Sequence, residues 1–418
     1  MLVAFGLRLL YALAFAPDVV VGGDGKTYHW LANLIADGHG FIRPWEYQLD
    51  GVVKPTAEHP PLYPLLLAAV SKAGGTSWAA HRIASCVMGT AMVLVAGLVA
   101  RRVAGPAAGL AAAALAAIYP LLVVSDGTLY SESLYVLTIA LALLAAYRFR
   151  DRPGVLAAAL LGGAIGLAVL TRAEALLLYP LLVIPLMWPL RGTALRHAAV
   201  ALAALALVIS PWVARNWSTF GRPVLSNNLG GLLAGANCHP TYYGPFTGLW
   251  RFECFGKVKP GSESYEADQY RDRGLRYARD HAGRLAAVVP IRILRTWDLW
   301  RPRQAAAYES FVEGRDRNWE RVGTAFYLLL LAPLALAGAW ILRRRGEQLR
   351  ILLAPVLLVT ISSATSYGIT RFRAAADVAL VVSAGVALAA AIAYLPELRA
   401  RLRTGGLRSI ARRSNEPA

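Results

Sequence analysis

The segment HPPLYPLLLAAVSKAGG (residues 59–75) sets the side of the membrane on which every later part of the chain lies. Hydropathy alone would make it a membrane helix. Its run of about 13 apolar residues is, however, shorter than the roughly 20 that a crossing requires. Counting it as a crossing would also carry the arginine-rich ends of all later segments to the outer side. We therefore predict an interfacial helix that rests on the outer face of the membrane.

The composition is that of a polytopic membrane protein. Of the 418 residues, 57% are hydrophobic and only 16% are charged, which is too apolar for a soluble protein with a polar surface. The net charge of +18 would suit nucleic-acid binding only if the arginines were gathered on a polar face beside a recognition module. They lie instead at the ends of apolar segments. We therefore expect membrane lipids, and no nucleic acid, as partners of the basic residues.

Apolar runs bounded by Arg, Gly or Pro predict about ten transmembrane helices, counting the N-terminal segment. The other runs lie near residues 79–100, 106–124, 132–147, 154–170, 173–190, 195–213, 321–342, 349–367 and 374–395. If residue 1 starts inside, an even number of crossings precedes each arginine cluster, at residues 101–102, 148–152, 191–196, 343–345 and 399–413. All of these clusters are then cytoplasmic. The sequence thus predicts an all-α, multi-pass protein of the cell (plasma or inner) membrane.

We expect the chain to have four parts. They are an N-terminal transmembrane catalytic module (1–214) with outer loops 17–78 and 125–131, an extracytoplasmic loop insert (215–318), C-terminal transmembrane helices (319–395) and a basic cytoplasmic tail (396–418). Within the insert we predict a helix over 264–281 and an interfacial helix over 284–300, where Trp and Arg alternate with apolar residues. No separate hydrophobic core is visible in the insert, so we do not interpret it as an independent domain.

Two of the three cysteines, Cys238 and Cys254, share one polar loop of the insert. Three cysteines are too few for a disulfide framework. If the loop is extracytoplasmic, a disulfide between these two can form and would stabilise the fold by roughly 3 kcal/mol. Cys86 lies within an apolar run and is expected to be part of the core.

Four acids at the outer ends of apolar segments are candidates for the chemistry, because an ionisable group there is costly. They are Asp24, Glu58, Glu132 and Glu174. Asp24 lies between two glycines, which allow tight turning and close approach, and Lys26 and Tyr28 follow it as candidate substrate-binding residues. Structural roles remain open for two of the acids. Asp24 would suit a helix N-cap, and Glu132 would favour the dipole of the helix that it begins.

Several cations on the outer side are candidate substrate-binding residues. Arg172 stands close to Glu174, and mutual pairing is the structural alternative for both, because pairing lowers the cost of burial. His59 is a candidate phosphate or hydroxyl partner, or a structural histidine. Arg371 and Arg373 lie outside, against the positive-inside preference, which indicates an anion to be held. We favour these two over Arg172 as the phosphate ligands.

The ordered motifs of the chain resemble the C-type membrane glycosyltransferase (GT-C) superfamily. The similarity is to its bacterial branch, which is related to protein O-mannosyltransferases and the lipid A aminoarabinose transferase. The motifs are GGDGKTYHWLANLIADGHGF (22–41), HPPLYPLLLA (59–68), SESLY (131–135), GLAVLTRAEALLL (166–178), PWVARNWSTFG (211–221) and YGITRFR (367–373). The resemblance runs over most of residues 8–395 and is weakest over the insert 235–318.

The resemblance implies a sugar donor carried on a polyprenyl phosphate, used on the extracytoplasmic face, with a first-loop aspartate as catalytic base. Asp24 takes that role, Glu132 matches the second-loop acid and is expected to act in catalysis by orienting the acceptor or neighbouring groups, and His59 occupies a position where relatives often carry a basic or polar residue. The chemistry agrees. A phosphate leaves without needing a proton, so an inverting transfer requires one base and cations for the developing charge. A glycosidase would instead require two carboxylates flanking the bond.

Cofactor, acceptor and function class remain open in part. A divalent metal could be held by Asp24 and Glu132, although no His/Cys/Asp cluster at ligand spacing indicates one. Asp24 is followed by glycine and lysine where many relatives have a second acid, which argues against a metal-binding acid pair. The acceptor is a glycan, a lipid or a protein. The main alternative is a transporter or lipid flippase, which should show inverted repeats and charges near helix midpoints; an envelope scaffold and a lipid-linked polymer ligase are the others.

Overall fold

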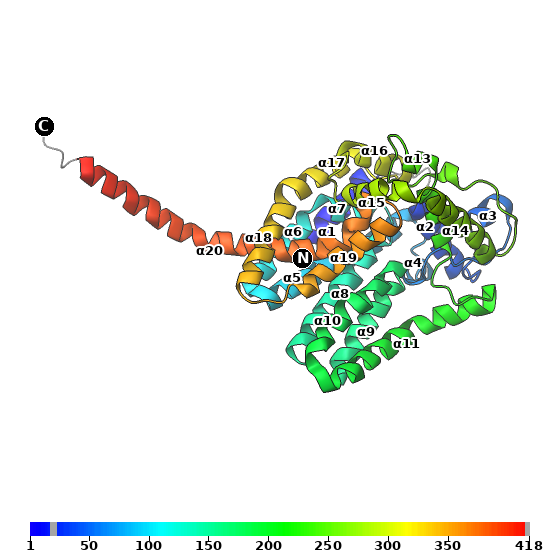
Figure 1. The fold of residues 1–418 in the computed structure, drawn as a ribbon, viewed down its shortest axis with the longest axis horizontal. Coiled ribbons are helices and arrows are strands. Elements are labelled where there is room, and N and C mark those ends of the chain that lie inside the picture. Colours follow the sequence, from blue (N-terminus) through cyan, green and yellow to red (C-terminus); the bar gives the residue numbers. More distant parts are fainter. Residues whose placement is uncertain (17–22, 414–418) are drawn as a thin grey trace.

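The computed structural model describes residues 1–16 and 23–413, with side chains up to residue 394. Within these ranges the chain is helical, and the only β pairing is an isolated bridge between Ile42 and Pro55. The start of the predicted outer loop, residues 17–22, and the end of the predicted tail, residues 414–418, lie outside the described residues. Figure 1 shows a helical body from which the C-terminal part of α20 (Ala374–Arg413) projects away from α2, α3 and α14.

Two groups of helices build this body. The first comprises α1 (Leu2–Leu10), α5 (Trp78–Ala104), α6 (Pro106–Ile118), α7 (Pro120–Gly127), α8 (Glu132–Asp151), α9 (Val155–Val169), α10 (Ile184–Met187), α11 (Ala194–Phe220), α17 (Arg317–Phe326), α18 (Ala332–Arg344), α19 (Arg350–Thr365) and α20. The second comprises α2 (Asp24–Ala36), α3 (Pro44–Asp50), α4 (Leu62–Lys72), α12 (Asn228–Ala236), α13 (His239–Tyr242), α14 (Glu263–Asp280), α15 (Ala282–Thr296) and α16 (Pro302–Glu313).

The number of membrane crossings differs from the sequence prediction. In the part of the chain that the structure describes, five helical runs are long and apolar enough to cross, at Trp78–Ala104, Glu132–Asp151, Ala173–Phe220, Arg317–Arg344 and Thr370–Tyr394. The α6–α7 pair, bent by 54°, would make six. Shorter apolar helices at Leu2–Phe15, Val155–Val169 and Arg350–Thr365 occupy three more of the predicted positions. A multi-pass, all-helical membrane protein is therefore confirmed, whereas the count of ten is not.

Proline explains two of the departures from simple spans. Pro120 begins α7 directly after the α6 helix, and a proline cannot donate the backbone hydrogen bond that would continue it. The predicted spans 173–190 and 195–213 fall in one stretch, Ala173–Phe220, which contains π and 3₁₀ turns around three prolines. The backbone leaves helical geometry at Arg191, with a φ of 42°. The two predicted segments lie on either side of this kink, and the Tyr179 hydroxyl of the first donates to the Ala198 carbonyl of the second at 2.8 Å.

Residues 59–75 contain α4, which is 11 residues long and too short to cross a bilayer, as the sequence indicated. The helix packs against α2, where Tyr63 and Tyr28 meet edge to face with ring centroids 5.0 Å apart. Tyr63 and Leu67 are fully buried in that contact. Packing against α2 thus fixes α4 in the group of helices that lies beside the site.

Small residues let the membrane helices approach closely. A Cβ added at Gly162 of α9 would lie 1.9 Å from the carbonyl oxygen of Ala201 in α11. A Cβ at Gly338 of α18 would lie 1.8 Å from the carbonyl oxygen of Ser383 in α20. Without a hydrophobic driving force between helices in lipid, such close backbone packing is a main source of their association.

The two ends of the helix α8 mark two opposite ends of the molecule, one with the arginine clusters and one with the outer-loop acids. Near its C-terminal end, Arg102 pairs with Asp151 and Arg150 pairs with Glu347, each at 2.7 Å, so the basic ends of α5 and α8 meet the α18–α19 turn. Glu132 begins the same helix. Twenty residues of α-helix span about 30 Å. The arginine clusters at residues 101–102, 148–152 and 343–345 therefore lie at one end and the outer-loop acids at the other.

Buried apolar residues of the insert 215–318 pack together with residues just before the last helix, α20. Ala236, Leu249 and Tyr308 of the insert are buried in one cluster with Tyr367 and Ile369, which precede α20. The expected interfacial helix over 284–300 is α15, and its arginines do not face a headgroup layer. Arg292 donates to the carbonyl of Ala236 and Arg295 to that of Thr247, each at 2.7 Å, and both are buried. The expected contact of these arginines with a headgroup layer is therefore corrected, whereas the interfacial position of α15 stays a prediction.

Candidate active site

Asp24 begins α2 and directs its carboxylate away from the helix axis. The preceding Gly23 has a φ of 83°, and a Cβ there would lie 2.6 Å from the hydroxyl of Tyr130. The Asp24 side chain makes no capping hydrogen bond, so the N-cap alternative is wrong. Its Oδ2 instead accepts from Nη2 of Arg371 at 2.8 Å. With 29% of its side chain exposed, Asp24 remains open to a ligand.

Arg371 connects the three parts of the chain at the site. It lies in the 3₁₀ turn Thr370–Arg373 between α19 and α20 and is 7% exposed. Besides Asp24, its guanidinium contacts Glu313 of α16 at 3.0 Å and Glu132 of α8 at 3.6 Å. The predicted N-terminal catalytic module therefore does not contain the whole cluster. The insert supplies Glu313, and the C-terminal helices supply the arginine.

Arg172 extends the charged cluster on the other side of Glu132. It donates to Glu132 at 2.6 Å and to Glu174 at 2.5 Å, so the expected pair with Glu174 is part of a larger network. The Glu132 side chain is almost fully buried and lies between Arg172 and Arg371. A buried carboxylate between two guanidinium groups fixes their positions, and we assign Glu132 this positioning role rather than direct ligand contact.

The remaining first-loop candidates surround Asp24 unequally. His59 places Nε2 3.8 Å from Oδ1 of Asp24. The buried Tyr28 packs against His59 with ring centroids 4.8 Å apart, so it supports the histidine rather than lining the cavity described below. Lys26 lies over the rings of Trp30 and Trp45, at 4.5 and 5.1 Å from their centroids. Its charge is thus directed towards aromatic faces and not towards Asp24.

Arg373 does not reach this site, and the expectation that it holds the donor phosphate is corrected. Its side chain is 0% exposed. It pairs with Asp298 at 2.8 Å and with Asp377 at 3.1 Å, and it lies over the ring of Tyr327 at 3.5 Å. These contacts satisfy the guanidinium inside the helix bundle, so Arg373 connects helices instead of binding substrate.

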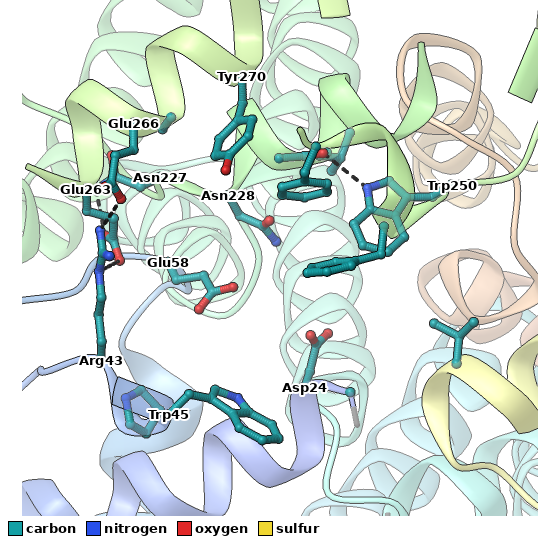
Figure 2. Close-up of a pocket in the computed structure, with 18 of the residues that line it drawn as sticks. Asp24, Arg43, Trp45, Glu58, Asn227, Asn228, Trp250, Glu263, Glu266 and Tyr270 are labelled. Carbon is teal, nitrogen blue, oxygen red and sulfur yellow. Dashed lines mark hydrogen bonds and ion pairs between the residues drawn. The ribbon is translucent and has the colours of Figure 1, made fainter. Parts of the chain in front are cut away.

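A cavity of about 530 Å³ opens above Asp24. Figure 2 shows the Asp24 carboxylate directed into it, with Glu58 and Trp45 on one side and Tyr270, Asn228 and Trp250 around the rest. The volume falls in the range of small-molecule sites, which are mostly apolar with a few placed polar groups. Sequence reasoning identified Asp24, Glu58 and Arg371 among its lining residues. It missed the lining residues Arg43, Trp45, Asn228, Trp250, Phe252, Phe255, Tyr270, Glu313 and Tyr367.

The missed residues carried no signal that the sequence alone could resolve. Glu313 ends an amphipathic helix of the insert, where an acid ordinarily faces solvent. Here it is buried and accepts a hydrogen bond from Tyr130 at 2.8 Å. The missed aromatic residues other than Trp45 and Tyr367 belong to the insert 235–318, the least covered part of the family resemblance. To predict that these residues line one cavity, one would need to know the tertiary contacts that bring α3, α12 and α14 together.

The electrostatic environment keeps Asp24 ionised. Burial by itself would raise the pKa of Asp24, but the charges of Arg371, His59 and Arg172 outweigh it and hold the pKa below its ordinary value of 3.8. The neighbouring Glu313 behaves differently. Burial raises the pKa of Glu313 to about 7, against the opposing charge of Arg371. Two carboxyl groups on one arginine thus differ in proton affinity, and Asp24 is the one that stays charged at neutral pH.

The structure does not gather metal ligands at the site. Among the described residues, no three or more His, Cys, Asp or Glu side chains are grouped so that they could hold a metal ion. Asp24 and Glu132 are each bound by an arginine instead. The residues present therefore do not fit the metal site that Asp24 and Glu132 were expected to be able to form.

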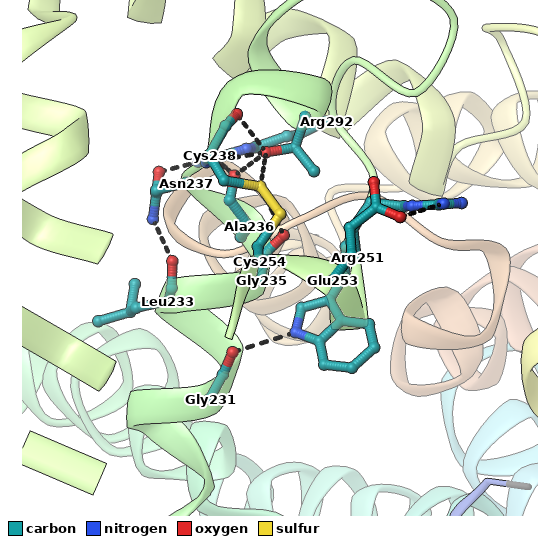
Figure 3. Close-up of a disulfide and its surroundings, with 12 residues drawn as sticks. Gly231, Leu233, Gly235, Ala236, Asn237, Cys238, Arg251, Glu253, Cys254 and Arg292 are labelled. Atoms are coloured by element: carbon teal, nitrogen blue, oxygen red, sulfur yellow. Dashed lines mark hydrogen bonds and ion pairs between the residues drawn. A yellow bond between two sulfur atoms is a disulfide. The ribbon is translucent and has the colours of Figure 1, made fainter. Parts of the chain in front are cut away.

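Cys238 and Cys254 form a disulfide that holds one wall of the cavity (Figure 3). The bond connects the end of α12 to the segment 250–255. The same segment is held by a hydrogen bond from the Arg251 amide to the Gly235 carbonyl, at 3.0 Å. Trp250 adds a second one, from its indole to the Gly231 carbonyl at 3.1 Å. The disulfide therefore fixes the segment that carries Trp250 into the cavity.

Reduction of this disulfide is expected to lower the stability of the protein by about 3 kcal/mol, because the bond closes a loop of about 15 residues. Thermal unfolding of Cys254→Ser in detergent, compared with wild type, measures the loss. Cys86→Ser is the control for replacing a cysteine outside the disulfide. An unchanged unfolding midpoint in Cys254→Ser would show that the disulfide contributes nothing.

Part of the chain matches a known protein family, and its fold resembles solved structures. Residues 58–214 match the dolichyl-phosphate-mannose-protein mannosyltransferase family. No match to a curated protein sequence was found. The fold resembles the archaeal oligosaccharyltransferase AglB from Archaeoglobus fulgidus, solved with an inhibitory peptide and a dolichol-phosphate. That structure has 15% identity and a TM-score of 0.54, and the alignment covers 96% of this chain and 51% of AglB.

A second solved structure is ArnT from Cupriavidus metallidurans bound to undecaprenyl phosphate, with 15% identity, a TM-score of 0.44, and coverage of 92% of this chain and 76% of ArnT. The present chain spans about half the length of AglB. The family match covers residues 58–214, and the likeness to AglB, which shows the fold alone, extends over almost the whole chain.

Proposed function

We propose that the protein transfers a hexosyl or pentosyl group from a polyprenyl-phosphate donor to a hydroxyl of an extracytoplasmic acceptor, with inversion, and that Asp24 is the general base. One observation carries the proposal. An ionised carboxylate, Asp24, lies at a cavity large enough for a substrate and is held at 2.8 Å by Arg371. A base and a cation side by side are what an inverting transfer from a phosphate requires.

In the proposed step, the acceptor oxygen attacks the anomeric carbon of the donor. Asp24 takes the proton from that oxygen as the new glycosidic bond forms. The bond between the anomeric carbon and the phosphate oxygen breaks, and its electron pair stays with the polyprenyl phosphate. Arg371 is positioned to stabilise the negative charge that develops there. Arg172 is connected to Arg371 by Glu132, which contacts both guanidinium groups. His59 lies near enough to Asp24 to contact a substrate hydroxyl.

Two observations support a site on the extracytoplasmic face. The disulfide Cys238–Cys254 borders the cavity, and structural disulfides persist in oxidising compartments. The basic ends of α5, α8 and α18 lie at the opposite end of the molecule, where the positive-inside rule puts the cytoplasm. We retain the four-part division of the chain within this proposal, with the catalytic cluster shared among its first three parts.

The donor class is supported by the family match and by the neighbours' names. The matching family takes its name from dolichyl-phosphate-mannose, and AglB was solved with a dolichol-phosphate. A sugar on a polyprenyl phosphate is therefore the donor that we propose. The acceptor, a glycan, lipid or protein, is addressed in the next subsection.

The test is a turnover assay with the full chain in proteoliposomes. Release of polyprenyl phosphate is measured from a panel of polyprenyl-phosphate sugars supplied with envelope extract. We expect one donor to be consumed, and only when it is offered on the side of the disulfide. Movement of the intact lipid-linked sugar across the bilayer without its consumption would instead support the transporter or flippase alternative.

A further inference from the structure

The outer part of the cavity is walled by aromatic rings from the segment held by the disulfide. Phe252 and Phe255 stack with ring centroids 5.2 Å apart, and Phe255 also meets Trp250 at 5.4 Å and Tyr270 at 4.9 Å. Phe252 is 74% exposed and lines the cavity. On the other side of the cavity, Trp45 of α3 presents a further ring (Figure 2).

The polar groups of this region divide into those already paired and those open to a ligand. Arg43 neutralises the acids at the rim, with contacts to Glu46 at 2.8 Å, Glu266 at 2.7 Å and Glu263 at 3.6 Å. The Glu58 carboxylate is exposed and has no side-chain hydrogen bond or ion pair to any described residue. Figure 2 shows Glu58 and the Asn228 amide directed into the cavity.

We propose that this region binds a neutral sugar unit of a glycan acceptor, a proposal that rests on the proposed function and names its acceptor class. The apolar face of a pyranose ring packs on Phe252 or Trp45, and its hydroxyls hydrogen-bond to Glu58 and Asn228. Flat aromatic surface combined with a few placed polar groups is the composition of a specific small-molecule site. A sugar held there presents its next hydroxyl to Asp24, which lines the same cavity.

Charge argues against an anionic acceptor. A phosphorylated lipid headgroup would enter a cavity in which acids outnumber the two arginines, Arg43 and Arg371. The acids that line it are Asp24, Glu46, Glu58, Glu263, Glu266 and Glu313. A neutral glycan can contact the aromatic rings and the unpaired polar groups at the same time.

The test uses binding as well as turnover. Wild type, Phe252→Ala and Glu58→Gln are reconstituted in nanodiscs and titrated with a neutral trisaccharide panel (mannotriose and maltotriose). An anionic trisaccharide (trigalacturonate) and a Ser/Thr-containing peptide are titrated in parallel. Phe311→Ala is the matched control, because Phe311 is 91% exposed and does not line the cavity. Thermal unfolding midpoints verify that each variant is folded.

We expect a neutral trisaccharide to bind wild type and Phe311→Ala equally, and to bind Phe252→Ala about tenfold more weakly, the loss of roughly one aromatic contact. Glu58→Gln should also bind it more weakly, because an amide has only one of the two acceptor oxygens of the carboxylate. Equal binding by all four proteins, or binding of the peptide or the anionic sugar in place of the neutral one, overturns the proposal. Because the titration needs no donor, it gives its result even if the wild type consumes no polyprenyl-phosphate sugar. A negative result in the turnover assay therefore does not decide the acceptor proposal, and a negative titration does not decide the proposed transfer reaction.

Discussion

Asp24→Asn is expected to lower the rate of sugar transfer by about 10²–10⁴-fold, the contribution of a positioned general base. Asparagine has nearly the same shape as aspartate and still accepts a hydrogen bond from Arg371, but it cannot take the acceptor proton at neutral pH. The polyprenyl phosphate should therefore still bind. We expect kcat to fall and the affinity for the donor to stay near that of wild type.

The assay that checks this compares single-turnover rates and donor affinities of Asp24→Asn and wild type in the same membrane preparation. Asp50→Asn is the matched control, because Asp50 is an exposed acid at the end of α3, in the same outer loop. Wild-type turnover by Asp24→Asn would refute the assignment of the base. Loss of donor affinity with unchanged kcat would make Asp24 a binding residue instead.

The pH dependence of the rate follows from the same contacts. Arg371, His59 and Arg172 hold the pKa of Asp24 below 3.8, so the base is already ionised throughout the range from pH 5 upwards, about one unit or more above that pKa. Any stability that this carboxylate contributes is present above its unfolded pKa and is lost only as the pH falls through its lower folded pKa. A rate change near pH 7 would therefore belong to Glu313 or Glu309, whose pKa values burial raises to about 7. Glu313→Gln would remove the part of that change that belongs to Glu313 and leave the acid limb in place.

The sequence predicted much of the charged cluster because an ion at a membrane edge has few structural reasons to be there. Asp24, Glu132, Arg172 and Arg371 come from four segments far apart in the chain, and the structure brings them into one network. The signal in each case was position. An ionisable residue lay where a membrane helix begins or ends on the outer side.

The same reasoning placed Arg373 wrongly, since it treated the two arginines of YGITRFR as equivalent. Residues two positions apart in a helical turn do not share a face. Arg371 is therefore directed to the cavity, whereas Arg373 is directed into the bundle, towards Asp298 and Asp377. Their predicted position on the outer side showed that the two arginines are unusual. Only the orientation of the turn determines which of the two guanidinium groups can contact a ligand.

The number of crossings was less predictable than the helical class. The apolar composition predicts that the chain is embedded in a membrane. It does not predict where a helix bends or how long each helix is. Pro120 bends one predicted span, and the backbone at Arg191 breaks another run. The segment 284–300 was expected to be interfacial because it combines arginines with Trp297 and Trp300, but α15 ends at Thr296, before both tryptophans. Its buried arginines are satisfied by carbonyl groups of the insert, a contact between distant segments.

Arg371→Ala is expected to destabilise the protein by about 3–5 kcal/mol and to abolish transfer, because it leaves buried carboxylates without their shared cation. Glu313 would be the group most affected, since it is buried and donation from Tyr130 would be its remaining hydrogen bond. Arg371→Lys should restore part of the stability and little of the activity, since lysine keeps the charge but cannot contact several carboxylates in the fixed geometry of a guanidinium.

Arg373→Ala provides the comparison that separates stability from phosphate binding. It removes a guanidinium from Asp298 and Asp377, so the unfolding midpoint should fall to a similar extent. Because Arg373 is enclosed in the bundle, the affinity for polyprenyl phosphate, measured as product inhibition or by direct titration below the unfolding temperature, should stay near wild type. The same affinity should fall in Arg371→Ala. Equal losses of affinity in the two variants would mean that Arg371 acts only through the fold, and the phosphate would then have to be held by Arg172 or His59.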